Sequence, residues 1–121
     1  MRVKSVKGMI KALESMPSLY YPIHFGLCGK VVYLTKEKVK LDFESLTYLN
    51  FTSEPINKKS VRVERGWELK EALEKFPGTA VVRTKHRIPG GEYEFIDNTM
   101  GISQNTEKYM FGGSETYIYL G

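Results

Sequence analysis

Hydrophobic residues recur at helical spacing in only two short segments of this chain, which limits the number of helices it can form. The first segment, residues 6–16, follows a potential N-cap at Ser5 and stops at Pro17. The second, residues 67–76, stops at Pro77-Gly78. Its apolar side consists of Trp67, Leu69, Ala72, Leu73 and Phe76. We therefore predict two helices.

Most of the remaining chain alternates apolar and polar residues, as half-buried strands do. Val39, Leu41 and Phe43 form the expected apolar face of one strand, and Lys36-Glu37 is expected to turn the chain between it and a strand at 30–35. Further strands are predicted at 20–25, 61–63, 79–84, 92–96, around Tyr109 and at 116–120. These elements predict a single α+β domain over residues 1–121, with two helices packed on antiparallel sheet made of hairpins.

The two helical segments share a motif. Ala12-Leu13-Glu14 and Ala72-Leu73-Glu74 lie 60 residues apart, and each is followed by a proline and an apolar extended run. The motif predicts a duplicated unit of one helix and three strands, covering 6–63 and 66–121. The alternative is that these are merely common helix residues before a common helix terminator.

The second of these motifs supports a family resemblance. Residues 68–77, running into Ala80-Val81-Val82, resemble the opening helix and strand of small uncharacterised proteins of bacteriophage and their hosts. The resemblance covers about fifteen residues and carries no catalytic or binding residue to this chain. It implies an accessory role in a phage or mobile element.

Composition narrows the class of protein. Hydrophobic residues make up 41% of the chain, enough for a core, and the lone Cys28 cannot form an internal disulfide. The first twenty residues contain no uninterrupted hydrophobic stretch. We expect a cytoplasmic protein that does not enter the membrane and needs no cofactor. The formal net charge of +4 favours anionic partners.

Few residues suit catalysis. His24 and Cys28 have the one spacing that would suit a base and a nucleophile, but a buried thiol beside a hydrogen-bonded histidine explains them as well. Glu92 and Glu94 share a strand face, and neither metal-ligand spacing nor a phosphate-binding loop is present. We predict that the protein is not an enzyme and has no metal site.

The register of one expected hairpin explains further polar residues. If Gly90-Gly91 forms a two-residue loop, His86 faces Phe95, which makes it a histidine at the edge of the core. The same register places Arg87 opposite Glu94 as a cross-strand ion pair.

A run of basic residues is the strongest functional signal. Arg83, Lys85 and Arg87 alternate along one strand face. A second group precedes the second helix and consists of Lys58, Lys59, Arg62 and Arg65. Together with eight tyrosines and six phenylalanines, they predict binding of nucleic acid or a nucleotide. The alternative is a solvated sheet edge whose charges prevent aggregation.

The C-terminal strand suggests a second function. Tyr117 and Tyr119 point to one face while Ile118 and Leu120 point to the other, so both faces are apolar. Such a strand is either covered on both sides or presents its tyrosines to a partner. The alternative function is therefore a protein-interaction module, such as an inhibitor of a host protein, and a homodimer is a further possibility.

Overall fold

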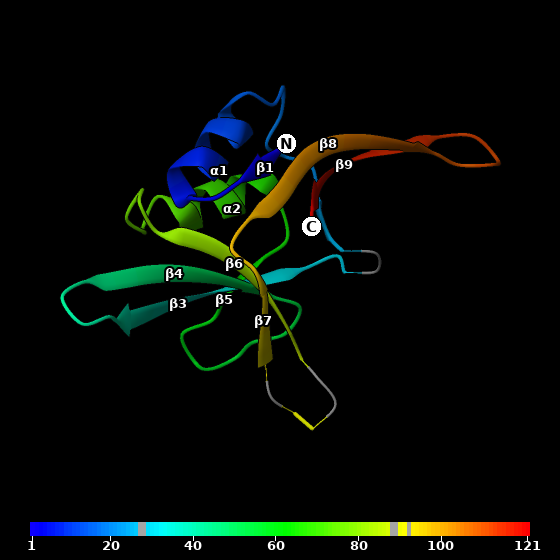
Figure 1. Ribbon diagram of the computed structural model, residues 1–121. Coiled ribbons are helices and arrows are strands. Elements are labelled where there is room, and N and C mark those ends of the chain that lie inside the picture. Colours follow the sequence, from blue (N-terminus) through cyan, green and yellow to red (C-terminus); the bar gives the residue numbers. More distant parts are fainter. Residues whose placement is uncertain (27–28, 88–89, 92) are drawn as a thin grey trace.

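The computed structural model describes residues 1–26, 29–87, 90–91 and 93–121, and its elements are labelled in Figure 1. In chain order they are β1 (Arg2–Val3), α1 (Val6–Glu14), β2 (Ile23–Phe25), β3 (Val32–Lys40), β4 (Ser45–Thr52), β5 (Val61–Val63), α2 (Gly66–Leu73), β6 (Val81–Arg87), β7 (Tyr93–Asp97), β8 (Met100–Lys108) and β9 (Ser114–Leu120). The predicted α+β class with two helices is confirmed.

The described strands form two sheets. The order is β1-β8-β9-β2 in one sheet and β5-β3-β4-β6-β7 in the other. Neighbouring strands are antiparallel except for β2 beside β9 and β4 beside β6. The sheets are therefore mainly antiparallel and built around hairpins, as predicted.

Both helices form where the hydrophobic spacing predicts them. The Ser5 hydroxyl accepts a hydrogen bond from the Gly8 amide (3.2 Å) and caps α1, as expected. Each helix ends two to three residues before its predicted limit, because the last turn tightens into bonds such as Met16 N–H to the Leu13 carbonyl. The prediction is wrong for one residue on the expected apolar side of α2. Trp67 is 44% exposed, although Leu69, two residues later, is buried.

The ends of two predicted strands are wrong. Lys36-Glu37 does not turn the chain, because β3 continues through it to Lys40 and the turn follows at 41–44. As a result, Leu41 and Phe43 lie exposed in that turn instead of on a buried strand face. The strand predicted around Tyr109 is present as β8, but it ends at Lys108, and Tyr109 begins the turn into β9.

The register of the β6–β7 hairpin also differs from the prediction. His86 faces Glu94 and Arg87 faces Tyr93. The predicted pairs of His86 with Phe95 and Arg87 with Glu94 are therefore wrong, because the connection between Arg87 and Tyr93 is five residues long instead of two. Ile88 and Glu92, and the side chains at 86–87 and 93–97, lie outside the described residues.

The two halves of the chain contain the same order of elements: strand, helix, strand and hairpin. β1, α1, β2 and the β3–β4 hairpin correspond to β5, α2, β6 and the β8–β9 hairpin, with β7 added in the second half. The correspondence starts at β1 and β5, earlier than the predicted units at 6 and 66. Common descent of the halves stays a prediction.

Each hairpin completes the sheet of the opposite half. The β3–β4 hairpin lies between β5 and β6, and the β8–β9 hairpin lies between β1 and β2. The registers match: Val32 faces Val63 as Met100 faces Val3, and Leu34 faces Phe51 as Ile102 faces Leu120. In Figure 1 the two hairpins extend in opposite directions from the pair of helices.

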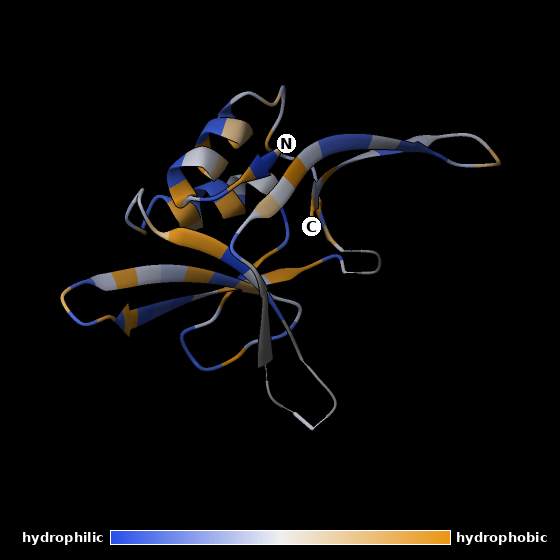
Figure 2. Cartoon of the chain, in the orientation of Figure 1, coloured by the Kyte–Doolittle hydropathy of each residue, from blue (hydrophilic) through white to orange (hydrophobic). Residues whose placement is uncertain are grey.

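One hydrophobic core joins both sheets and both helices. Its largest fully buried members come from both helices and both sheets, and include Met9, Leu13, Leu34, Leu49, Phe51, Leu69, Leu73, Met100, Ile118 and Leu120. Figure 2 shows the hydrophobic residues gathered where helices and strands face one another. The core holds each helix against strands of both halves, which fixes where the helix ends lie.

Candidate anion-binding site

Four lysines converge on an open hollow beside the end of α2. The hollow has a volume of about 570 Å³ and is lined by Lys36, Lys38, Lys59, Lys75 and Phe76. We call it the lysine hollow. β3 contributes two of the lysines, the loop before β5 contributes one, and the segment after α2 contributes the fourth together with the aromatic ring.

The sequence explains why these lysines gather there. On β3, Val32 and Leu34 point into the core, so Lys36 and Lys38 lie on the same face of the strand. The strand extends beyond the core, and polar residues then occupy its inner face. The segment after α2 packs Phe76 against the core and brings Lys75 to this face.

The lysine hollow is strongly positive. Among the side chains that the structure describes, no carboxylate lines it and none of its four lysines forms an ion pair. All four lysines are exposed, whereas Phe76 is half-buried. Like charges held together repel one another, so the cluster carries a cost that an anion would relieve.

The other half of the chain shows that the fold does not require these lysines. The matched registers place Gln104 and Thr106 on β8 where β3 has Lys36 and Lys38. Likewise, Ser15 follows α1 where Lys75 follows α2. The same backbone thus forms with neutral side chains at these positions.

Of the basic residues predicted to bind a ligand, Lys59 lies in the lysine hollow. Lys58 is exposed in the same turn. Arg62 forms an ion pair with Glu64 (Nη2 to Oε1, 2.7 Å), and Arg65 precedes α2 and donates to the Tyr20 carbonyl (2.7 Å). Lys59 is therefore the member of the second predicted group that lines the lysine hollow.

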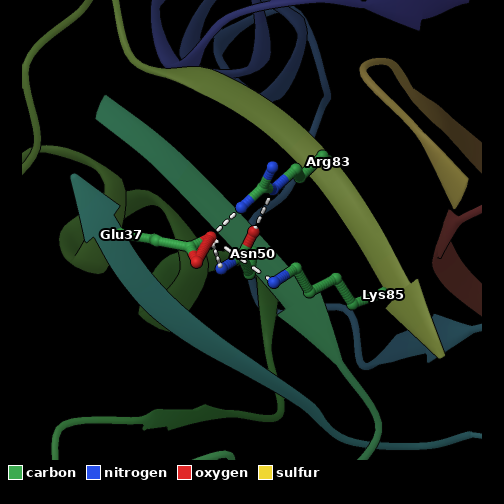
Figure 3. Close-up of polar contacts among 4 residues, drawn as sticks. All are labelled: Glu37, Asn50, Arg83 and Lys85. Atoms are coloured by element: carbon green, nitrogen blue, oxygen red, sulfur yellow. Dashed lines mark hydrogen bonds and ion pairs between the residues drawn. The ribbon is translucent and has the colours of Figure 1, made fainter. Parts of the chain in front are cut away.

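Arg83 and Lys85 lie on the opposite face of the same sheet, away from the lysine hollow. Figure 3 shows both side chains pointing toward Glu37 and Asn50. Arg83 forms an ion pair with Glu37 and its Nε donates to Asn50 Oδ1 (2.5 Å), while Lys85 Nζ lies 3.4 Å from the Glu37 carboxylate. The guanidinium also stacks on Tyr48, 4.0 Å from the ring centre.

Burial shapes the electrostatics of this polar cluster. The side chains of Arg83 and Lys85 are only 12% and 16% exposed. Burial lowers the pKa of Arg83, and burial together with the charge of Arg83 lowers the pKa of Lys85. Two cations share one carboxylate, so the cluster keeps a positive charge, but its donors already have partners within the protein.

The remaining predicted residues of this region are only partly described. Arg87 ends β6 opposite Tyr93, and its side chain lies outside the described residues, as do those of His86 and Glu94. Cys28 and Glu92 lie entirely outside them. The structure therefore does not place Arg87 or Cys28 in a site.

His24 and Tyr117 form the counterpart of Arg83 and Tyr48 in the four-stranded sheet. Their rings stack with centroids 3.9 Å apart, and His24 Nε2 lies 3.3 Å from Glu115 Oε1. Tyr117 and Tyr119, predicted to form an interface, are both half-buried. His24 is thus engaged by Glu115 and Tyr117, as expected of a histidine with a structural role.

The pKa of Glu115 in this cluster is lowered from its ordinary value. A 2.5 Å hydrogen bond from the Tyr109 hydroxyl, with a smaller effect from His24, lowers the pKa of Glu115. Stabilisation from this bond is present above the ordinary pKa of glutamate and is lost as the pH falls through the lowered value.

We expect Tyr109→Phe to raise the pKa of Glu115 toward its ordinary value, because the strongest donor to the carboxylate is removed. The measurement is a carboxyl NMR titration. Tyr119→Phe is the control, since it removes a different tyrosine hydroxyl, on the face of β9 that also carries Glu115. An unchanged pKa in Tyr109→Phe would contradict the assignment of the hydrogen bond.

Both hairpins end in exposed hydrophobic residues. Phe43 between β3 and β4 is 100% exposed, and Met110 and Phe111 between β8 and β9 are 91% and 97% exposed. In Figure 2 the outer ends of both hairpins are orange. Large apolar side chains that cover no core are typical of contact surfaces.

The described part of the chain contains neither a candidate metal site nor a membrane-spanning helix. No group of three His, Cys, Asp or Glu side chains there could hold a metal ion. None of its helices has the length and apolar character needed to cross a membrane.

The chain was compared with protein families, curated proteins and solved structures, and no match was found in any of the three.

Proposed function

We propose that the protein is a non-catalytic binding protein for a phosphate-bearing ligand, and that the lysine hollow is its binding site. The observation that supports this function most is the convergence of Lys36, Lys38, Lys59 and Lys75 from three segments of the chain. Lysine binds phosphate as a point charge that several donors can share.

The site favours this class of ligand for two further reasons. Neutral residues occupy three of the matching positions in the other half, so packing alone does not explain the lysines. The hollow is open and its lysines are exposed, which gives a ligand direct access. A nucleotide or a nucleic acid strand fits these conditions, and an accessory role in a phage or mobile element would be compatible with either.

The test is a fluorescence anisotropy titration of the wild-type protein with a labelled single-stranded oligonucleotide at several salt concentrations. We expect the logarithm of the binding constant to fall with the logarithm of salt concentration, with a slope of about −3 if all four lysines contact phosphates. Absence of binding to oligonucleotides, nucleoside triphosphates and tripolyphosphate, or binding indifferent to salt, would reject the proposed function.

A second candidate function is a protein-interaction module, and the exposed hairpin ends are the observation in its favour. Phe43 and Phe111 occupy corresponding turns and are almost fully exposed. The half-buried Tyr117 and Tyr119 offer less surface to a partner. An interface of aromatic residues responds little to salt, so the response to salt separates the two functions.

A further inference from the structure

A second hollow adjoins the lysine hollow and contains the single tryptophan of the chain. It has a volume of about 260 Å³, and its lining includes Val61, Trp67, Glu71 and Lys75. Lys75 lines both hollows, so the two lie next to each other at this side chain. A ligand held by the lysines can therefore extend toward the indole ring.

Trp67 is available to a ligand. The indole-bearing residue is 44% exposed, as is Val61 on the neighbouring edge strand. An exposed tryptophan gives up hydrophobic stabilisation that a buried position would have provided. In a hollow next to phosphate-binding cations, a flat aromatic ring is the usual partner for a nucleobase.

The first half of the chain contains a matching hollow, and no aromatic ring is among the described residues that line it. Its lining lies 60 residues earlier and includes Met1, Arg2, Lys11 and Ser15, which correspond to Val61, Arg62, Glu71 and Lys75. Lys7 stands at the position of Trp67. The fold therefore forms this hollow twice but places a tryptophan only beside the lysine hollow.

We infer that Trp67 is a stacking platform for a nucleobase, and that the ligand is a nucleotide unit whose phosphates occupy the lysine hollow. This inference rests on the proposed function and narrows its ligand from any polyphosphate to one that carries a base. Glu71 lies in the same lining and can accept hydrogen bonds from the amino groups of a base.

Intrinsic fluorescence tests the inference directly, because Trp67 is the only tryptophan. The folded protein is titrated with a short single-stranded oligonucleotide, a nucleoside triphosphate and inorganic tripolyphosphate. We expect quenching by the probes that carry a base and little or none by tripolyphosphate, since only a stacked ring contacts the indole. The relative affinities of the first two probes show whether a strand or a free nucleotide is preferred.

Two substitutions complete the test. Trp67→Leu should weaken binding of the base-containing probes about tenfold or more and leave tripolyphosphate binding unchanged. Trp67→Phe keeps an aromatic face and should retain most of the affinity. Salt-dependent binding without quenching, or an equal effect of Trp67→Leu on all three probes, would overturn the inference while the proposed function stands. Failure of all three probes to bind would reject both.

Discussion

Replacing three lysines of the hollow by their counterparts from the other half of the chain should weaken ligand binding about 100-fold. The variant is Lys36→Gln, Lys38→Thr and Lys75→Ser, which leaves Lys59 as the last cation of the site. Each lost contact of an exposed lysine costs about 1 kcal/mol, so three cost about 3 kcal/mol, and about 1.4 kcal/mol is a factor of ten in affinity. The salt slope should also flatten by about two units.

The fold should tolerate this change, because all three lysines are exposed and the matching backbone already carries Gln104, Thr106 and Ser15. Exposed charges contribute little to the free energy of unfolding. The control variant removes the same charge elsewhere, by Lys7→Gln, Lys11→Gln and Lys108→Gln. Anisotropy titrations with a single-stranded oligonucleotide compare the two variants, and equal losses of affinity would show that net charge, and not the lysine hollow, drives binding.

Arg83→Ala should destabilise the protein by about 3 kcal/mol. The change removes the ion pair with Glu37, the hydrogen bond to Asn50 and the stacking on Tyr48. Asn50 is only 2% exposed, so its side-chain oxygen loses a donor that water cannot easily replace. Removing one member of a half-buried polar cluster therefore lowers the free energy of unfolding strongly. Chemical denaturation monitored by circular dichroism measures the effect.

Two further variants show which contacts of Arg83 account for the loss of stability. Lys85→Ala should cost less, since Lys85 contributes one contact of 3.4 Å to Glu37. Arg83→Lys keeps the charge without the guanidinium fork and should lie between wild type and Arg83→Ala. A stable Arg83→Ala protein that no longer binds an oligonucleotide would instead return Arg83 to the ligand site that the sequence predicts.

The helices could be predicted from sequence because their signals are local. Ser5 caps α1, Pro17 and Pro77 follow the helices, and the apolar spacing shows which side faces the core. Trp67 is the exception, since its spacing fits the buried side while the turn at the start of α2 leaves it at the surface.

The outer parts of the hairpins could not be predicted in the same way. Alternation of apolar and polar residues indicates a strand only where one face of that strand is buried. Beyond Thr35, β3 leaves the core. Lys36 and Glu37 therefore look like a turn although they continue a ladder opposite Leu49 and Tyr48. Phe43 was expected to be buried because it is apolar, and it lies at the exposed end of the hairpin.

The candidate site depends on tertiary contacts that sequence spacing does not reveal. The sequence predicts Lys59 as a ligand-binding residue but not Lys36, Lys38 or Lys75, because the segments that carry these lysines meet only when the end of α2 packs beside β3. The one available signal was the repetition of lysine at alternate positions of β3. Arg83 and Lys85 show the converse, because a stripe on one strand does not reveal Glu37 two strands away.

The exchange of hairpins between the halves determines when the chain can fold during its synthesis. β1 pairs with β8 and β2 pairs with β9, so the first two strands of this fold wait for the last two before their sheet can close. Contacts between such distant segments slow folding, because long loops must close before any pairing is gained. A ribosome-bound first half would carry the β3–β4 hairpin with the edges meant for β5 and β6 unpaired, and would remain open to aggregation until those two strands have been synthesised.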